Sequence, residues 1–130
     1  MKIYVAARFT DKEMVQDVYR KLTQAGHNIT ADWTKHKNVK PYDEHPVQAG
    51  EYATEDMSGV MASDVFILFT SAEPGSGVSA ELGGAIACNT LTGKPRIYVV
   101  GPYAHTNAFF FHPAVYARVD RFDEIIAELK

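Results

Sequence analysis

Glu81 is the acidic side chain whose surroundings best suit chemistry. It follows a loop of small residues, Gly75-Ser76-Gly77-Val78-Ser79-Ala80, and precedes an uncharged run from Leu82 to Ala87. We expect a helix over residues 79–91 with Glu81 in its first turn, where open backbone amides and the helix dipole favour an ionised carboxylate. Such a group could act as a nucleophile or stabilise a cation, and it could equally be a solvated acid at a helix start.

The same loop fits the pattern G-x-G-x-x-A of dinucleotide-binding proteins. That motif also needs an acidic residue about 20 positions further on, to bind the ribose. The sequence has no Asp or Glu between Glu81 and Asp120. A nicotinamide cofactor is therefore disfavoured, and we expect no cofactor of any kind.

Other residues that could do chemistry lack partners in the sequence. Cys88 lies in the middle of the expected helix without a recognisable His partner, so we interpret it as a buried structural residue. The five His residues show no spacing typical of a zinc site, and we expect no metal. The Phe-rich loop from Asn107 to Pro113 is either an interface or a cover over the sheet edge.

The composition bounds the class of protein. The 130 residues carry 13 Lys and Arg against 16 Asp and Glu, and 46% of them are hydrophobic, which is typical of one globular domain. Without a basic run, polymeric nucleic acid and anionic membranes are not expected partners. No stretch approaches the ~20 apolar residues of a membrane helix. A single Cys and the absence of a signal-peptide pattern predict a cytoplasmic location.

Short β-rich runs alternate with longer helical patterns along the chain. We expect strands over residues 2–6, 27–33, 64–70, 96–100 and 116–119. We expect helices after the capping-box pattern Thr10-Asp11-Lys12-Glu13, over 49–61 and 79–91, and from about Asp120. This alternation predicts a single domain, residues 1–130, with a small doubly wound α/β fold of the Rossmann or flavodoxin-like type. Such a fold has a five-stranded parallel sheet with helices on both faces.

Ligands bind such sheets beyond the carboxyl ends of the strands, where the strand order reverses. The residues that follow the expected strands are Ala7-Arg8-Phe9, Asp32-Trp33, 70–79 and those from Gly101 onward. We therefore expect a ligand site built from these segments.

Three motifs in this order carry a family resemblance. They are the segment Glu73-Pro74-Gly75-Ser76-Gly77-Val78-Ser79-Ala80-Glu81-Leu82-Gly83-Gly84-Ala85, the segment from Ile3 to Asp11, and Asp56, eight residues before Asp64. They resemble the signature, the opening strand with its substrate loop, and the second functional acid of the nucleoside 2-deoxyribosyltransferase family. That family includes 2′-deoxynucleoside 5′-phosphate N-hydrolases, and the resemblance covers essentially the whole chain.

The resemblance implies cleavage of the N-glycosidic bond of 2′-deoxynucleosides or their 5′-monophosphates. Glu81 would attack C1′ to form a covalent deoxyribosyl ester, which water or a second base would resolve. Asp56 would protonate the leaving base or orient the sugar, and Tyr4 would place its hydroxyl near Glu81. Phe9 and Trp33 would stack on the base, although Trp33 could equally be core. The other expected substrate-binding residues are Ala7, Arg8, Gly75, Ser76, Gly77, Ser79 and Asn107.

The sequence departs from the family pattern at three positions. Glu73 stands where the family often has Asp. Gly75 stands where the transferases often place an acid and the hydrolases a phosphate-binding Ser; Ser76 and Ser79 could bind a 5′-phosphate instead, which slightly favours a nucleotide substrate. Gly84 stands where a larger side chain is common, which alters the expected pocket shape. A non-catalytic module that binds a nucleotide or a nucleotide-derived signal on the same fold is the alternative.

A chain of this size has little left over to build a lid. We therefore expect a homodimer or higher homo-oligomer, in which a second copy completes the pocket through the loop from Asn107 to Pro113. The family resemblance suggests the same arrangement.

Overall fold

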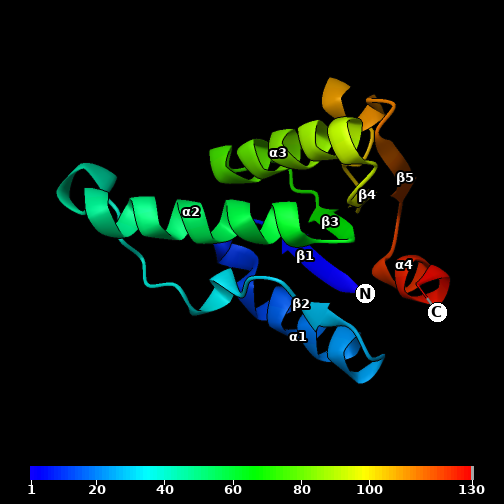
Figure 1. The fold of residues 1–130 in the computed structure, drawn as a ribbon, viewed down its shortest axis with the longest axis horizontal. Helices are drawn as coiled ribbons and strands as arrows, with labels where there is room; N and C mark the ends of the chain where they lie inside the picture. Colours follow the sequence, from blue (N-terminus) through cyan, green and yellow to red (C-terminus); the bar gives the residue numbers. More distant parts are fainter. Residues whose placement is uncertain (130) are drawn as a thin grey trace.

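The computed structural model describes residues 1–129 and has a five-stranded parallel sheet at its centre (Figure 1). The strand order is β2-β1-β3-β4-β5. The strands are β1 (Lys2–Ala6), β2 (Asn28–Ile29), β3 (Val65–Phe69), β4 (Arg96–Val100) and β5 (Val115–Val119). This is the expected flavodoxin-like α/β fold.

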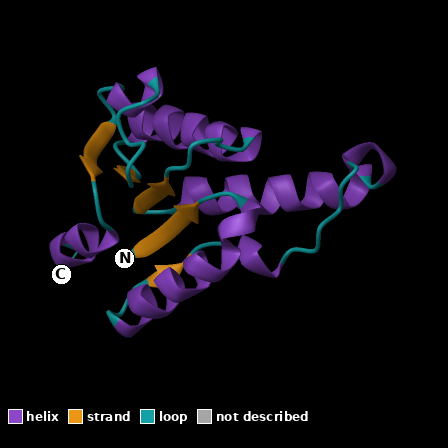
Figure 2. Cartoon of the chain, turned by 180° about the vertical axis from the view of Figure 1, so that it is seen from behind, coloured by secondary structure: helices purple, strands orange, loops and turns teal. Residues whose placement is uncertain are grey.

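Four α-helices connect and cover the strands: α1 (Lys12–Gln24), α2 (Pro46–Ala62), α3 (Ser76–Thr92) and α4 (Phe122–Glu128). Helices α2 and α3 run side by side, as both ribbon views show (Figures 1 and 2). Right-handed crossovers place α2 and α3 on one face of the sheet and α1 on the other. Phe122 of α4 packs against Phe69 of β3, on the α1 side.

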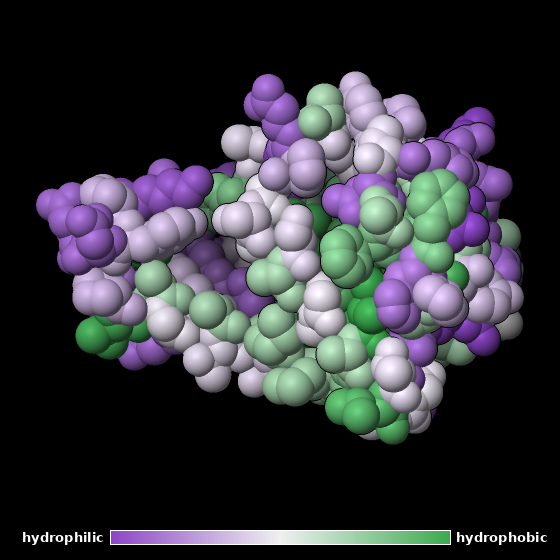
Figure 3. Space-filling model, turned by 90° about the horizontal axis from the view of Figure 1, so that it is seen from above, coloured by the Kyte–Doolittle hydropathy of each residue, from purple (hydrophilic) through white to green (hydrophobic). Residues whose placement is uncertain are grey.

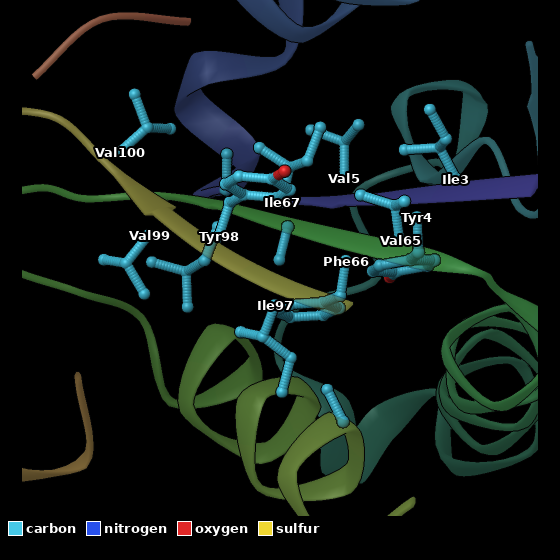
Figure 4. Close-up of a cluster of buried hydrophobic side chains, with 14 of the residues drawn as sticks. Ile3, Tyr4, Val5, Val65, Phe66, Ile67, Ile97, Tyr98, Val99 and Val100 are labelled. Atoms are coloured by element: carbon cyan, nitrogen blue, oxygen red, sulfur yellow. The ribbon is translucent and has the colours of Figure 1, made fainter. Parts of the chain in front are cut away.

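The core follows from the sequence of the three central strands. Continuous runs of apolar residues, such as Val65 to Phe69, suit strands that are covered on both faces. The hydrophobic core is built on side chains from β1, β3 and β4, which are almost completely buried (Figure 4). Within the part of the chain that is described, no helix is long and apolar enough to cross a membrane.

Two local predictions are wrong. The capping box at Thr10 does not form, because Phe9–Asp11 is a 3-10 turn and the carboxylate of Asp11 binds the guanidinium of Arg8 at 3.3 Å. The second strand is only two residues long rather than seven. Its expected continuation is diverted where Asp32 accepts a hydrogen bond from the Thr34 amide at 3.0 Å and starts the 3-10 turn Trp33–Lys35.

Helix α3 begins at Ser76, three residues earlier than expected, with Gly75 as its N-cap. The loop glycines and serines therefore form the first helical turn, and Glu81 lies in the second turn rather than the first. Only the first turn has open amides, so the expected stabilisation of the Glu81 carboxylate by a helix start is not realised.

Candidate active site

The predicted acids lie near the point where the strand order reverses, between β1 and β3. Tyr4 lies in β1, Glu81 on α3 and Asp56 on α2. The α2–α3 contact is close because Gly84 has no side chain: a Cβ there would lie 2.5 Å from the Sδ of Met57. The two acid-bearing helices can therefore approach over the end of the sheet.

Tyr4 fixes the position of the Glu81 carboxylate. Its side chain is fully buried, and its ring lies parallel to Phe66 with centroids 5.8 Å apart. Gly59 of α2 lies against the ring, since a Cβ at Gly59 would come within 3.1 Å of Tyr4 Cδ2. Held in this way, the Tyr4 hydroxyl donates a hydrogen bond to the carboxylate of Glu81. The contact that the family resemblance suggested for Tyr4 is therefore present.

Burial gives Glu81 an unusual affinity for a proton. Desolvation raises the pKa of the carboxyl to about 7, the negative charge of Asp56 adds to the rise, and the hydrogen bond from Tyr4 opposes it. The sequence led us to expect an easily ionised acid, and the difference arises because Glu81 points into the protein rather than toward a helix start. The pKa of Tyr4 lies above its ordinary range, mainly through burial, so this hydroxyl remains a donor.

Asp56 is half-buried, and its Oδ1 atom is buried without a hydrogen-bond partner among residues 1–129. Burial raises the pKa of its carboxyl to about 6, the charge of Glu55 adds to the rise, and His36 opposes it. Asp56 and Glu81 are close enough for one charge to raise the pKa of the other group. Two interacting carboxyls with raised pKa values hold one proton between them near neutral pH, which is the condition for acid–base chemistry.

Two side chains near the acids were not singled out in the sequence. Tyr19 of α1 is buried, its hydroxyl donates to the carbonyl oxygen of Ala31 at 3.4 Å, and its pKa is raised by burial and by surrounding carboxylates that include Asp56 and Glu81. His36 follows the 3-10 turn after β2 and acts on Asp56. The helical period of Tyr19 indicates only that it is core, and a lone His in a polar connection carries no signal.

The aromatic residues expected to cover the base differ in exposure. Phe9 is 40% exposed and lies with its ring centroid 6.4 Å from that of Trp33. Trp33 is only 6% exposed, and its Nε1–H donates to the Val5 carbonyl oxygen at 2.7 Å. Of the two interpretations of Trp33, the core one fits this burial, which leaves Phe9 as the ring available for stacking.

A cavity of about 520 Å³ lies along the other flank of α3, and neither Glu81 nor Asp56 lines it. Three predicted binding residues meet there: Arg8 after β1, Ser79 in the first turns of α3, and Asn107 in the Phe-rich loop. Apolar side chains of β3, α3 and that loop complete the walls. These three binding residues therefore lie on the other side of α3 from the predicted catalytic residues.

The remaining predicted binding residues lie around the start of α3 or in the core. Gly75 is partly exposed, Ser76 and Gly77 are exposed, and Ala7 is 7% exposed. Cys88 is half-buried, with its Sγ 4.0 Å from the Thr92 hydroxyl. No group of three or more potential metal ligands occurs within residues 1–129.

The molecule has an uneven surface around these elements. In the space-filling view, a hollow with a hydrophilic floor separates the projecting end, which carries the start of α2, from the rest of the molecule (Figure 3).

Helix α3 has no charged residue other than Glu81, and it leaves Ala80, Gly83, Ala87 and Leu91 exposed. The uncharged sequence of this helix therefore does not mean that it is buried all round.

Comparisons with known proteins show likeness at the level of the fold. No protein-family model and no curated protein matches the sequence. Among solved structures, the chain resembles a CMP N-glycosidase, BcmB, from Clostridium botulinum, with a TM-score of 0.62, 17% identity, and coverage of 99% of this chain and 98% of that one. It also resembles a 2-deoxyribosyltransferase from Bacillus psychrosaccharolyticus, with a TM-score of 0.70, 16% identity, and coverage of 97% and 90%.

Proposed function

We propose that this protein cleaves the N-glycosidic bond of 2′-deoxynucleosides or their 5′-monophosphates through a covalent intermediate on Glu81. The observation that carries the proposal is the cluster of the buried Tyr4 with the partly buried acids Glu81 and Asp56, in which two acids with raised pKa values share one environment. The fold likeness to an N-glycosidase and a deoxyribosyltransferase over nearly the whole chain supports the same chemistry.

The reaction divides into two displacements at C1′. The ionised carboxylate of Glu81 attacks C1′ and the bond from C1′ to the base nitrogen breaks. The electron pair of that bond stays with the base, which takes a proton from Asp56. Water or a second base then attacks C1′, the ester bond to Glu81 breaks, and Asp56 accepts the proton of the incoming group. This is the two-carboxylate scheme of retaining glycosidases.

The raised pKa values leave one proton for the two acids to share. Between about pH 6 and 7 the two carboxyls hold roughly one proton together. The productive arrangement places that proton on Asp56 and leaves Glu81 ionised. The hydrogen bond from Tyr4 stabilises an ionised Glu81 and orients the oxygen that attacks.

The cavity on the other flank of α3 supports a substrate with a 5′-phosphate. Arg8 contributes a guanidinium whose Nε is bound to Asp11, and Ser79 and the early amides of α3 supply further donors. A phosphate suits an arginine together with hydroxyls at a helix start. We propose a nucleotide in preference to a nucleoside on this ground.

We further propose that the active unit is a homo-oligomer with a shared site. Phe109 and Phe111 are 63% and 53% exposed, and Asn107 beside them lies on the flank of α3 that does not carry Glu81. Exposed aromatic side chains suit an interface. A second copy that covers this loop would bring an Asn107 toward the opposite site.

A non-catalytic binding module is the second candidate, favoured by the fact that the cavity beside Arg8 contains no acid. A panel of deoxynucleosides and deoxynucleotides separates the two when free base is assayed with and without an acceptor base. We expect base release by the wild-type protein and none by Glu81→Gln. Tight binding of an intact ligand without release, or undiminished release by Glu81→Gln, would overturn the enzymatic proposal.

A further inference from the structure

Residues Trp33 to Lys37, in the first part of the connection between β2 and α2, are fixed at both ends beside the acid cluster. At one end, the indole of Trp33 is hydrogen-bonded to β1 through Val5. At the other end, the His36 ring lies parallel to the ring of Tyr52, with centroids 3.8 Å apart and an interplanar angle of 5°. The Lys37 amide donates to the Tyr52 hydroxyl at 3.2 Å. The segment therefore holds His36 in one place against α2.

His36 meets the face of α2 that carries Asp56. Tyr52, Glu55 and Asp56 are related by steps of three and four residues, so they share one helix face. The His36 side chain is 13% exposed, and its Nε2 lies 3.4 Å from a carboxylate oxygen of Glu55. This Nε2 has no partner with hydrogen-bond geometry within residues 1–129, and neither does the buried Oδ1 of Asp56. His36 thus contacts the residue next to Asp56 on α2, its charge acts on Asp56, and each of the two side chains has a buried polar atom without a partner among residues 1–129.

We propose that His36 is a positioning residue for Asp56, and that its protonation state decides whether Asp56 or Glu81 holds the proton that they share. The catalytic consequence rests on the function proposed above. The placement itself rests on the stacked ring, the contact with Glu55 and the unpartnered atoms of His36 and Asp56.

The groups around Asp56 give the direction of the effect. Glu55 on the same helix and Glu81 from α3 carry negative charge, whereas Tyr4 from β1 and Tyr19 from α1 stay neutral because burial raises the pKa of both hydroxyls. His36 can carry positive charge there, and this charge opposes the rise in the pKa of Asp56. Lys35 and Lys37 flank His36 in sequence, and the ammonium of Lys35 lies 3.7 Å from Asp32.

A protonated His36 favours an ionised Asp56, which leaves the shared proton on Glu81 and makes the nucleophile unreactive. Without a positive charge on His36, the pKa of Asp56 rises toward that of Glu81, so a larger share of the protein holds the proton on Asp56 and leaves Glu81 ionised. The charge on His36 would therefore make the position of the shared proton depend on pH. The proton lies on Glu81 in the unproductive arrangement and on Asp56 in the productive one.

Carboxyl ¹³C NMR titration of the ligand-free protein tests the placement without any substrate. We compare the wild-type protein with His36→Phe, which can keep the stacking on Tyr52 but removes the charge, and with His36→Gln as a second variant in case the first does not fold. His45→Gln is the matched control, because His45 is exposed at the start of α2. We expect the pKa of Asp56 to rise by about 0.5 unit or more in both His36 variants and to stay unchanged in the control.

The pH dependence of base release tests the catalytic consequence. In His36→Phe, the ratio of kcat/KM at pH 6 to that at pH 8 should rise about threefold or more, because more of the protein holds the proton on Asp56. An unchanged Asp56 titration in both His36 variants, or a wild-type pH profile despite a shifted titration, would overturn the proposal. If the wild-type protein releases no base from any substrate, the proposed function fails, whereas the NMR titration still decides the placement of His36.

Discussion

The two flanks of α3 differ in burial and in charge. On one flank, the partly buried Glu81 is bound to Tyr4 and lies near Asp56, and its pKa is raised to about 7. On the other flank, a cavity of about 520 Å³ is lined by Arg8, Ser79 and Asn107 and contains no acid. The first flank keeps a proton and a potential nucleophile out of water, while the second offers an arginine and hydroxyl groups to an anion. One helix thus separates the part suited to bond cleavage from the part suited to binding.

The largest expected effect comes from removing the nucleophile on the buried flank. Glu81→Gln should lower kcat by about 10³-fold or more, because the amide cannot form the ester at C1′. Release of free base, measured under saturating substrate, checks this. Glu51→Gln, an exposed acid on α2, is the control and should retain wild-type activity. Similar losses in both variants would mean that the loss is not specific to Glu81 and would contradict its role as the nucleophile.

Asp56→Asn should have the next largest effect on activity. Loss of the general acid should reduce kcat by about 10²-fold or more for substrates with poor leaving bases. The same change removes a negative charge that raises the pKa of Glu81, so Glu81 should titrate at lower pH. Carboxyl NMR measures this shift, and an unchanged Glu81 titration would show that the two acids do not interact.

The buried acid should also make the stability of the protein depend on pH in a specific direction. Glu81 has a raised pKa in the folded state, so folding binds a proton between about pH 4.5 and 7 and stability falls as pH rises through this window. Glu81→Gln resembles the protonated form. The free energy of unfolding of Glu81→Gln minus that of the wild type should therefore increase by about 3 kcal/mol when the pH is raised from 4.5 to 8. Denaturant unfolding at the two pH values measures the gain, and a constant difference would contradict the burial of an ionisable Glu81.

The smallest expected effect lies on the open flank. Arg8→Gln should raise KM for deoxynucleotides about tenfold, with little change for the matching deoxynucleosides, because only the nucleotide carries the charge that Arg8 would bind. Steady-state kinetics on matched pairs measure this selectivity. Arg20→Gln, an exposed cation on α1, is the control. An equal rise in KM for deoxynucleotides and deoxynucleosides would contradict the proposal that this flank binds the phosphate.

Apart from β2, the sequence predicts each strand to within one residue at both ends, because long apolar runs and glycine stops are local signals. Gly26 and Gly93 end helices with φ of +93° and +85°. The strand order was not predicted; once it is known, the handedness of the crossovers fixes which face of the sheet each helix covers. The start of α3 was placed three residues late, because Gly75 to Gly77 look like a flexible loop while the backbone amides of this stretch begin the helix.

The candidate site was less predictable than the fold. Glu81, Asp56 and Tyr4 stand out through motifs, but the raised pKa of Glu81 depends on burial that no local pattern encodes. His36 could not be found at all, since its importance arises from stacking on Tyr52, sixteen positions along the chain. Contacts of this kind appear only when the elements are assembled.

The central claim is that Glu81 forms a covalent bond with the sugar. The most direct test is to quench the protein with acid during turnover of a deoxynucleotide, digest it, and measure the mass of the peptide that contains Glu81. We expect a fraction of this peptide to carry the added mass of one deoxyribosyl group, with its 5′-phosphate, and no such adduct in Glu81→Gln. Rapid base release without any adduct on Glu81, or an adduct on another residue, would contradict the account.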